Sequence, residues 1–296
     1  MIVENEKQLT TFALDVMKRT PDPRLREIMT SLITHLHAFV REVRLSEREF
    51  QDACALIAEM GQRTNDTHNE VVLMAGSLGV SSLVCLLNNG DNGNPETNQN
   101  LLGPFWRLNS PPTKNGDNIN PKGAPGTPMF VKARFTDVEG APIEGAEVDV
   151  WQADDDGFYE NQLDRSWNMN LRGKFASDGN GDISFRSIMP LGYPIPTEGP
   201  VGRLLKAQER HPFRPAHLHF LAAKPGFKTL ISQVYDREDP RIQTDAQFGV
   251  TQALVGEFKR RRDKAPASDV TGEWISLDYA FKLEKGESRL PRPPIK

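Results

Sequence analysis

The spacing of apolar residues changes once along this chain, and that change limits the folds open to it. In the N-terminal part, apolar residues recur at steps of three and four, as in an amphipathic helix, most clearly over residues 21–43. Residues 88–126 are rich in Asn, Gly and Pro, which interrupt regular structure. Beyond them the apolar period becomes two, as in strands with one buried face. The sequence therefore predicts a helical region followed by a sheet region.

The helical region divides into three predicted helices, at residues 21–43, 46–62 and 66–87. Thr20 can cap the first of them, and the acidic Asp22 faces the positive end of its dipole. We expect these helices to scaffold the protein, to cover its site or to form a dimer.

The sheet region contains short strand patterns separated by turns that contain Gly, at residues 130–135, 146–151, 183–188, 217–222, 229–234 and 275–283. Short strands at regular intervals favour an antiparallel β-sandwich over a parallel sheet with intervening helices. We therefore predict an α+β protein. Residues 1–100 form a helical dimerisation or cover region, and residues 101–296 form a β-sandwich catalytic domain.

Charge and hydropathy argue against several classes of function. The net charge is −4 without a basic cluster, which argues against binding to DNA or RNA. No stretch approaches the ~18 apolar residues of a membrane span, and the N-terminus lacks a leader pattern. Cys54 and Cys85 lie in helical patterns, where we expect buried thiols rather than a disulfide or a thiolate metal site. We expect a cytoplasmic protein.

Residues 214–221 contain two histidines, His217 and His219, spaced for one face of a strand. Leu218 and Phe220 take the opposite face. Two imidazoles in this arrangement can chelate a metal, although a half-exposed strand also accounts for them. Three of the six histidines fall within nine positions here, which favours the metal site.

Two tyrosines upstream, Tyr159 and Tyr193, lie in loop-like settings, and the chain has only four tyrosines. Each can instead be a buried ring with a hydrogen-bonded hydroxyl. Taken together with the histidines, they give two phenolates and two imidazoles, a set that suits iron(III) better than zinc or copper. The chain has neither a thiolate cluster nor a helical His-Glu-x-x-His pattern, which argues against the usual zinc hydrolase sites.

These residues, in this order, resemble the intradiol ring-cleavage dioxygenases, non-haem iron(III) enzymes that open catechols between the two hydroxylated carbons. The resemblance extends over most of the chain and is carried by residues 101–106, 149–153, 157–159, 192–196, 198–205 and 214–219. Within the family, residues 193–196 followed by 199–205 most resemble the hydroxyquinol 1,2-dioxygenases.

The resemblance implies that Tyr159, Tyr193, His217 and His219 hold one Fe(III) per subunit. The metal then serves as Lewis acid and template for a catechol and O2. Tyr193 matches the tyrosinate that leaves the metal on substrate binding and takes up a proton, while Tyr159 stays bound.

Two further residues match catalytic positions of the family. Arg214 matches the position that stabilises negative charge on the substrate, with a structural ion pair as its alternative. Gln233 matches a pocket glutamine that hydrogen-bonds a ring oxygen or the dioxygen-derived intermediate, with an ordinary strand contact as its alternative.

The resemblance also implies a flat, mostly apolar substrate pocket. Two positions depart from relatives: Gly76 stands where they carry an aspartate that faces the ring, and Gln247 stands at a position that is usually apolar. Either Gln247 replaces the missing carboxylate or the preferred substrate carries a different substituent. The expected pocket residues are Leu73, Gly76, Gly103, Pro104, Phe105, Ile195, Pro196 and Gln247.

The expected reaction is cleavage of hydroxyquinol (benzene-1,2,4-triol) to 3-hydroxymuconate or maleylacetate. Cleavage of catechol or a substituted catechol to cis,cis-muconates is the alternative. A homodimer built through the helical parts, with lipid in a helical cleft, is implied by the resemblance alone. Two rivals stay open: a zinc or iron(II) site with Asp236 or Asp239 as third ligand, and a non-catalytic β-sandwich binding module.

Overall fold

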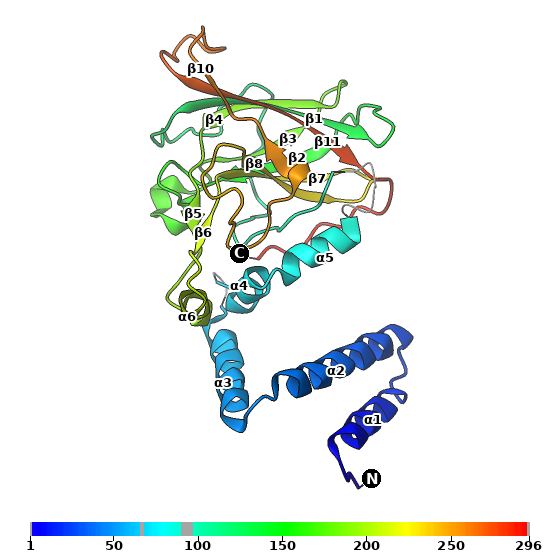
Figure 1. The fold of residues 1–296 in the computed structure, drawn as a ribbon. Helices are drawn as coiled ribbons and strands as arrows, with labels where there is room; N and C mark the ends of the chain where they lie inside the picture. The colour runs from blue at the N-terminus through cyan, green and yellow to red at the C-terminus, as the bar shows by residue number, and fades with distance from the viewer. Residues whose placement is uncertain (1, 66–67, 90–96, 295–296) are drawn as a thin grey trace. The chain divides into compact units, whose positions relative to one another are not determined.

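The computed structural model describes residues 2–65, 68–89 and 97–294, and Figure 1 shows the order of its helices and strands. The chain divides into two compact units at the junction of Ala58 and Glu59. The helices are α1 (Glu6–Met17), α2 (Pro23–Val43), α3 (Glu47–Arg63), α4 (Glu70–Ser77), α5 (Val80–Asn89) and α6 (Pro200–Ala207), with short 3-10 turns η1 (Glu160–Gln162), η2 (Arg165–Trp167) and η3 (Gln252–Leu254).

Helix α2 begins at Pro23, two residues later than predicted. The side chain of Asp22, not Thr20, caps it by accepting a hydrogen bond from the backbone N of Leu25 at 2.8 Å. Pro23 then occupies the first turn, where a missing N–H costs nothing. The predicted apolar residues of α2, such as Leu32 and Leu36, lie exposed.

The single helix predicted over residues 66–87 is wrong, because two helices occupy its described part. Helix α4 ends at Ser77 and α5 starts at Val80, with Gly79 between them at φ +74°. A left-handed glycine of this kind ends a helix. Residues 66–67 lie outside the described residues.

In the part of the chain that the structure describes, no single helix is long and apolar enough to cross a membrane. Helices α4 and α5 meet the criteria of length and apolarity only when taken together, and the pair is bent.

Two sheets form the predicted sandwich. The four-stranded sheet has the order β10 (Lys259–Arg261), β11 (Trp274–Leu283), β1 (Pro128–Asp137), β4 (Asp182–Ile188), and the five-stranded sheet has the order β3 (Arg172–Ala176), β2 (Glu147–Gln152), β7 (His217–Ala223), β8 (Leu230–Asp236), β9 (Val255–Gly256). Strands β5 (Tyr193–Pro194) and β6 (Phe213–Arg214) form a small separate ladder.

The predicted helical region and sandwich are confirmed, with one difference in strand direction. Strand β1 pairs with β11 in parallel, and β8 pairs with β9 in parallel, so both sheets are mixed. Each of these strands reaches its neighbour through a long connection rather than a hairpin, which is how parallel pairs arise.

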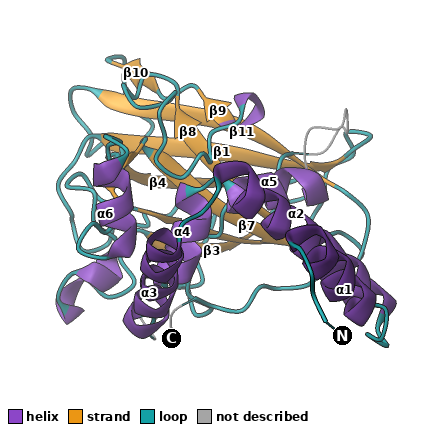
Figure 2. Cartoon of the chain, turned by 60° about the horizontal axis from the view of Figure 1, so that its bottom comes forward, coloured by secondary structure: helices purple, strands orange, loops and turns teal. Residues whose placement is uncertain are grey.

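Alternation along the strands separates the core from the site. Leu218 and Phe220 of β7 point between the sheets into the main apolar core. Burial of side chains of this size contributes about 1.5–3 kcal/mol each. His217 and His219 therefore lie on the outer face of the five-stranded sheet. Helices α4 and α5 lie over that face (Figure 2).

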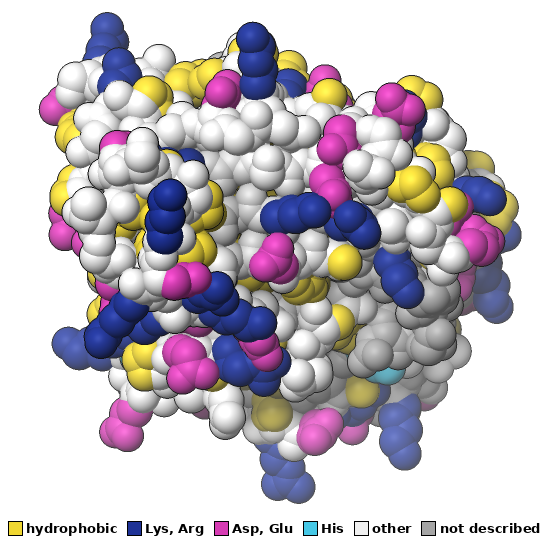
Figure 3. All heavy atoms as spheres, turned by 90° about the horizontal axis from the view of Figure 1, so that it is seen from above, with side chains coloured by type: hydrophobic (Ala, Val, Ile, Leu, Met, Phe, Trp, Pro, Cys, Tyr) yellow, Lys and Arg dark blue, Asp and Glu magenta, His cyan; other side chains and the backbone are white. Residues whose placement is uncertain are grey.

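The outer face of the four-stranded sheet is charged. Basic and acidic side chains are interspersed over it (Figure 3). Asp182 pairs with both Lys132, at 3.0 Å, and Arg134, at 2.7 Å. Mixed charges of this kind keep a sheet face solvated without one strong sign of potential.

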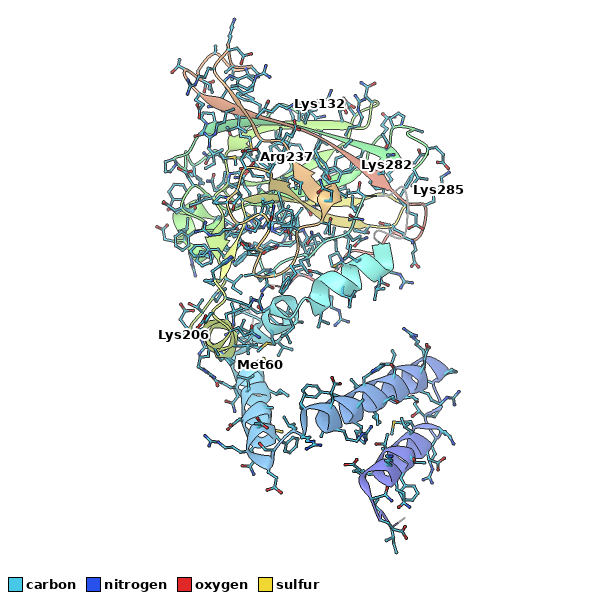
Figure 4. All side chains as sticks on the ribbon, in the orientation of Figure 1. Met60, Lys132, Lys206, Arg237, Lys282 and Lys285 are labelled. Carbon is cyan, nitrogen blue, oxygen red and sulfur yellow. The ribbon has the colours of Figure 1, made fainter. Side chains whose placement is uncertain are left out.

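Helix α6 contacts α4 and residues 59–60, within the second unit. Figure 4 places Met60, at the end of α3, close to α6 and its Lys206, and Arg203 of α6 donates to Glu59 at 2.9 Å. The buried carboxylate of Glu70 caps α6 by accepting from the N–H of Val201 at 3.0 Å. This cap holds α4 against the segment that follows β5.

Candidate metal centre

Four polar side-chain atoms converge on the outer face of β7. They belong to two tyrosines and two histidines that are all buried, with exposed fractions of 7% or less. The atoms form a closed ring: Tyr159 OH to Tyr193 OH, 3.3 Å; Tyr193 OH to His217 Nε2, 3.5 Å; His217 Nε2 to His219 Nε2, 3.2 Å; His219 Nε2 to Tyr159 OH, 3.1 Å.

The ring has the dimensions of a single metal coordination sphere. Donors ~2.1 Å from one ion, at angles between square and tetrahedral, lie ~3.0–3.4 Å apart. Three of the four edges, 3.1–3.3 Å, lie within that range, and the fourth, 3.5 Å, is slightly longer. The structure therefore brings together the four predicted ligands in an arrangement that fits one ion.

Local contacts orient the donors. The backbone carbonyl of Pro215 lies 2.7 Å from His217 Nδ1 and can only accept, so Nδ1 carries the proton and Nε2 presents its lone pair. The ring of His219 stacks on Trp151 at 4.5 Å, and the ring of Tyr159 stacks on Phe105 at 4.3 Å. These stacks restrict the rotation of both ligands.

Burial sets the protonation of the four groups. It raises the pKa of Tyr159 well above its usual value and raises that of Tyr193 as well, where attraction by Arg214 opposes it. Burial, with the charge of Arg214 next in size, lowers the pKa of His217 to about 3. Neutral imidazoles keep their lone pairs, and a cation in the ring would favour the phenolate forms. Two phenolates best match a highly charged, hard ion.

Arg214 lies buried beside the ring, on β6. It donates through Nε and Nη2 to Asp245, both at 3.1 Å, and through Nη2 to Tyr235 OH at 2.6 Å. Burial acts to raise the pKa of Asp245, but the charge of Arg214 opposes it, and the pKa lies below its usual value. The guanidinium is therefore charged, paired and fixed in direction.

Gln233 lies beside His219 in the ladder between β7 and β8. Its side-chain oxygen accepts from Arg214 at 3.1 Å and from Tyr235, and its amide nitrogen donates to the carbonyl of Leu101 at 2.6 Å. The structure thus shows Gln233 holding Arg214 in place.

The predicted pocket residues fall into three groups. Gly103 and Phe105 adjoin the ring of donors, since a Cβ on Gly103 would lie 3.3 Å from His219 Cε1. Gly76 and Gln247 face each other, with Leu73 one turn before Gly76 on α4. The remaining members follow β5 or precede Phe105: Ile195 is buried, and Pro196 and Pro104 are exposed.

Some neighbours of the site were not singled out from the sequence. Asp245 and Tyr235 fix Arg214, and Trp151 supports His219. A lone Asp in a loop or a Tyr in a strand carries no local signature, because its role depends on a partner far along the chain. A cavity of about 780 Å³ lined in part by Asp245 is not lined by any of the four donors.

The rival carboxylate ligands are engaged elsewhere. Asp239 accepts from the backbone N of Ala216 and of Arg241, both at 2.8 Å, and Asp236 accepts from Glu238. Within residues 2–65, 68–89 and 97–294, no three His, Cys, Asp or Glu side chains group as a metal site. The rival zinc or iron(II) site therefore finds no third ligand there.

The chain matches two families of known proteins. Residues 101–284 match the family described as Dioxygenase, and residues 22–94 match the Catechol dioxygenase N terminus.

Individual relatives cover nearly the whole chain. Hydroxyquinol 1,2-dioxygenase of Rhizobium sp. (strain MTP-10005) is 40% identical over 274 residues, 91% of this chain and 92% of that protein. Catechol 1,2-dioxygenase of Candida albicans is 37% identical over 264 residues, 88% of this chain and 86% of that protein. The structure of hydroxyquinol 1,2-dioxygenase from Pseudomonas putida DLL-E4 superposes with a TM-score of 0.85 at 35% identity, covering 95% of this chain and 99% of that one.

Proposed function

This chain belongs to the intradiol ring-cleavage dioxygenases, and on that premise we propose that it cleaves hydroxyquinol between its two adjacent hydroxylated carbons. One O2 is consumed and both atoms enter the product, 3-hydroxymuconate, which tautomerises to maleylacetate. The observation that carries the proposal is the closed ring formed by Tyr159, Tyr193, His217 and His219.

We assign one Fe(III) per subunit to that ring. Iron(III) bound there supplies a Lewis-acidic template for the two adjacent oxygens of the substrate. The donor set supports this assignment, because two phenolates and two neutral imidazoles favour a hard trivalent ion. The buried surroundings exclude water that would compete for the same positions.

The two tyrosines take different roles. Tyr159 is fully buried and stacked on Phe105, so it is the permanent anionic ligand. Tyr193 lies on the two-residue strand β5 and interacts with Arg214. We assign it the uptake of a proton from a substrate hydroxyl, at its phenolic oxygen.

Arg214 stabilises negative charge on the bound substrate. Its support is the fixed guanidinium, held by Asp245 and Tyr235 and already ordered before substrate arrives. Gln233, which was predicted to touch the substrate, contributes by fixing Arg214. The amide nitrogen of Gln233 has two N–H groups, and only one of them is used by the bond to Leu101. The second can donate a hydrogen bond to a substrate oxygen.

Gly76 and Gln247, which face each other, support hydroxyquinol as the substrate. Gly76 has no side chain, and the side-chain oxygen of Gln247 fills that space, so a neutral amide stands where a carboxylate is missing. A neutral acceptor suits the third hydroxyl of hydroxyquinol. Catechol and substituted catechols are the alternative substrates, and the catechol 1,2-dioxygenase relative favours them.

We propose a homodimer built through helical surfaces within residues 1–100, with residues 101–296 as the catalytic domain. The exposed apolar residues of α2 support it, among them Leu32, Leu36 and Phe39. We further propose that lipid binds in a helical cleft. Replacing Leu32 and Leu36 with Glu should shift the sedimentation coefficient to that of one chain. An unchanged value would remove this surface as the interface.

The chain has two free cysteines, Cys54 and Cys85, which support a place in the cytoplasm, where thiols stay reduced.

Oxygen uptake tests the reaction and the substrate together. Iron-loaded protein is supplied in parallel with hydroxyquinol, catechol, pyrogallol and methyl- or chlorocatechols. We expect the highest kcat/KM for hydroxyquinol, with one O2 consumed per ring. Preference for unsubstituted catechol would overturn the substrate, and uptake by none of them would overturn the reaction.

A further inference from the structure

Unpaired polar atoms concentrate in one place on the outer face of the five-stranded sheet. Over the described residues, six buried side-chain N or O atoms have no hydrogen-bond partner, and all belong to four residues. They are Asp149 Oδ1, Trp151 Nε1, Arg172 Nε, Nη1 and Nη2, and His219 Nδ1. Unpaired buried atoms of this kind are few in native proteins, so their clustering calls for one common explanation.

The four residues are neighbours across three strands. Trp151 of β2 stands opposite Arg172 of β3 on one side and opposite His219 of β7 on the other. Asp149 lies two positions from Trp151 and so shares its face. All four are at most 2% exposed, so bulk water does not reach them.

Neighbouring groups leave these atoms without an aligned hydrogen bond. Arg172 Nη2 forms an ion pair with Glu160 Oε2 at 2.6 Å, which balances its charge, but no N–H of Arg172 makes a hydrogen bond. Glu160 also accepts from Arg107 at 3.1 Å. The other oxygen of Asp149 accepts from the indole N–H of Trp106 at 3.2 Å.

We propose that Asp149, Trp151, Arg172 and His219 line an internal hydration site that holds ordered water behind the metal centre. Three of these residues offer only N–H donors there, while Asp149 offers an acceptor. Water both donates and accepts, and buried waters commonly make about three hydrogen bonds. An anion would meet the carboxylate of Asp149, and a cation would meet Arg172, so water is the ligand that satisfies both.

The site completes the orientation of one proposed ligand, and this part rests on the proposed iron centre. His217 is oriented by the carbonyl of Pro215. His219 has no such protein acceptor for Nδ1. Water at this position accepts from Nδ1–H, which leaves Nε2 of His219 facing the other donors. Trp151 and Arg172 are thus positioning residues that act through His219.

A high-resolution crystal structure of the full chain tests the site itself, with or without iron. We expect ordered water within about 3 Å of His219 Nδ1 or Trp151 Nε1, connected through water to Asp149 Oδ1 and to Arg172. Direct hydrogen bonds from Arg172 to Asp149, with no water beside His219, would overturn the proposal.

Replacing Trp151 with Phe tests the action on the metal, because it removes the indole N–H while an aromatic ring stays beside His219. The matched control is Trp274→Phe, since the Trp274 N–H donates to Asp263 O at 2.9 Å on the other sheet. The readouts are iron retention against a chelator and the visible absorption band. We expect iron binding to be ~10-fold weaker in Trp151→Phe, in line with outer-shell losses of 10–100-fold. The control should bind iron as tightly as the wild type.

Equal iron retention in Trp151→Phe and wild type would contradict the positioning role. Arg172→Gln provides a second variant, expected to weaken iron binding as well, if Trp151→Phe does not fold. Absence of iron binding by the wild type would instead overturn the proposed function, and the crystallographic test of the water would still stand.

Discussion

The side-chain oxygen of Gln247 occupies the place where a Cβ on Gly76 would stand. The Gln247 amide nitrogen donates to Ser77 Oγ at 2.7 Å, and its backbone oxygen accepts from Ser82 at 3.0 Å. These bonds fix the loop around Gln247 against α4 and α5. The same loop carries Asp245, the partner of Arg214. The Gln247 side chain can take this position only because residue 76 has no side chain.

Gly76→Ala should therefore change the pocket more than the stability. The new methyl group meets the far end of a flexible side chain, so the Gln247 amide can swing away and lose its bond to Ser77. That loss costs about 1 kcal/mol, which the better helix propensity of Ala largely offsets. We expect unfolding free energies within about 1 kcal/mol and an altered ratio of kcat/KM for hydroxyquinol and catechol.

Gly202→Ala is the matched contrast, because the same overlap occurs there with rigid backbone. A Cβ on Gly202 would overlap the carbonyl of Thr197. Backbone cannot swing aside, so overpacking should cost about 1–3 kcal/mol or more. Urea unfolding of the two variants distinguishes these cases, and equal losses would contradict the difference between side-chain and backbone neighbours.

Tyr159→Phe should abolish stable iron binding while leaving the fold intact. The variant removes one of the four donors but keeps the ring that stacks on Phe105. We expect a loss of affinity beyond the roughly 10–100-fold that follows removal of an outer-shell partner. Iron content and the visible tyrosinate-to-iron band are the measurements. Tyr279→Phe is the control, since its hydroxyl bonds to Ala253 away from the site, and full colour in Tyr159→Phe would remove Tyr159 from the ligand set.

Asp245→Asn should strongly destabilise the protein, because it leaves the guanidinium of Arg214 buried without its countercharge. Loss of one partner from a buried ion pair costs about 3–5 kcal/mol. The comparison is Asp269→Asn, which removes the partner of Arg186 at the solvent-exposed surface, where we expect no measurable change. Denaturant midpoints report both, and a loss as small as that of the control would show that Arg214 does not depend on Asp245.

Asp182 should make stability depend on acid pH. Hydrogen bonds from Arg134 are the largest cause that lowers its pKa from 3.8 to about 2, against a smaller effect of burial. Because the folded-state pKa is the lower one, the stabilisation is present above about pH 4 and is lost as the pH falls toward 2. The side chains of Arg134 and Lys132 are about half exposed, so the stabilisation is at most about 1 kcal/mol.

Thermal unfolding of wild type and Asp182→Asn at a series of pH values tests this. The difference between the two should be largest near neutral pH and should shrink below about pH 4. A difference that stayed constant to acid pH would assign the effect to packing rather than to charge.

The predictable features of this protein were local ones. The alternation around His217 and His219 placed both imidazoles on one face, and β7 confirms that placement. The helical region and the sandwich followed from periodicity for the same reason, since periodicity reflects burial along one element. The cap of α2 was misassigned to Thr20, because Thr20 and Asp22 are both good caps and only the backbone course chooses between them.

The chain's own residues determined which side chains could bind a hard metal ion and on which face of a strand two of them would stand. Tertiary structure alone decided that Tyr159 and Tyr193 reach those histidines, that Asp245 fixes Arg214 across 31 residues, and that Glu70 caps α6 across 131. Such contacts join distant segments, and no local spacing encodes them, because their formation depends on how the loops close when the two sheets pack.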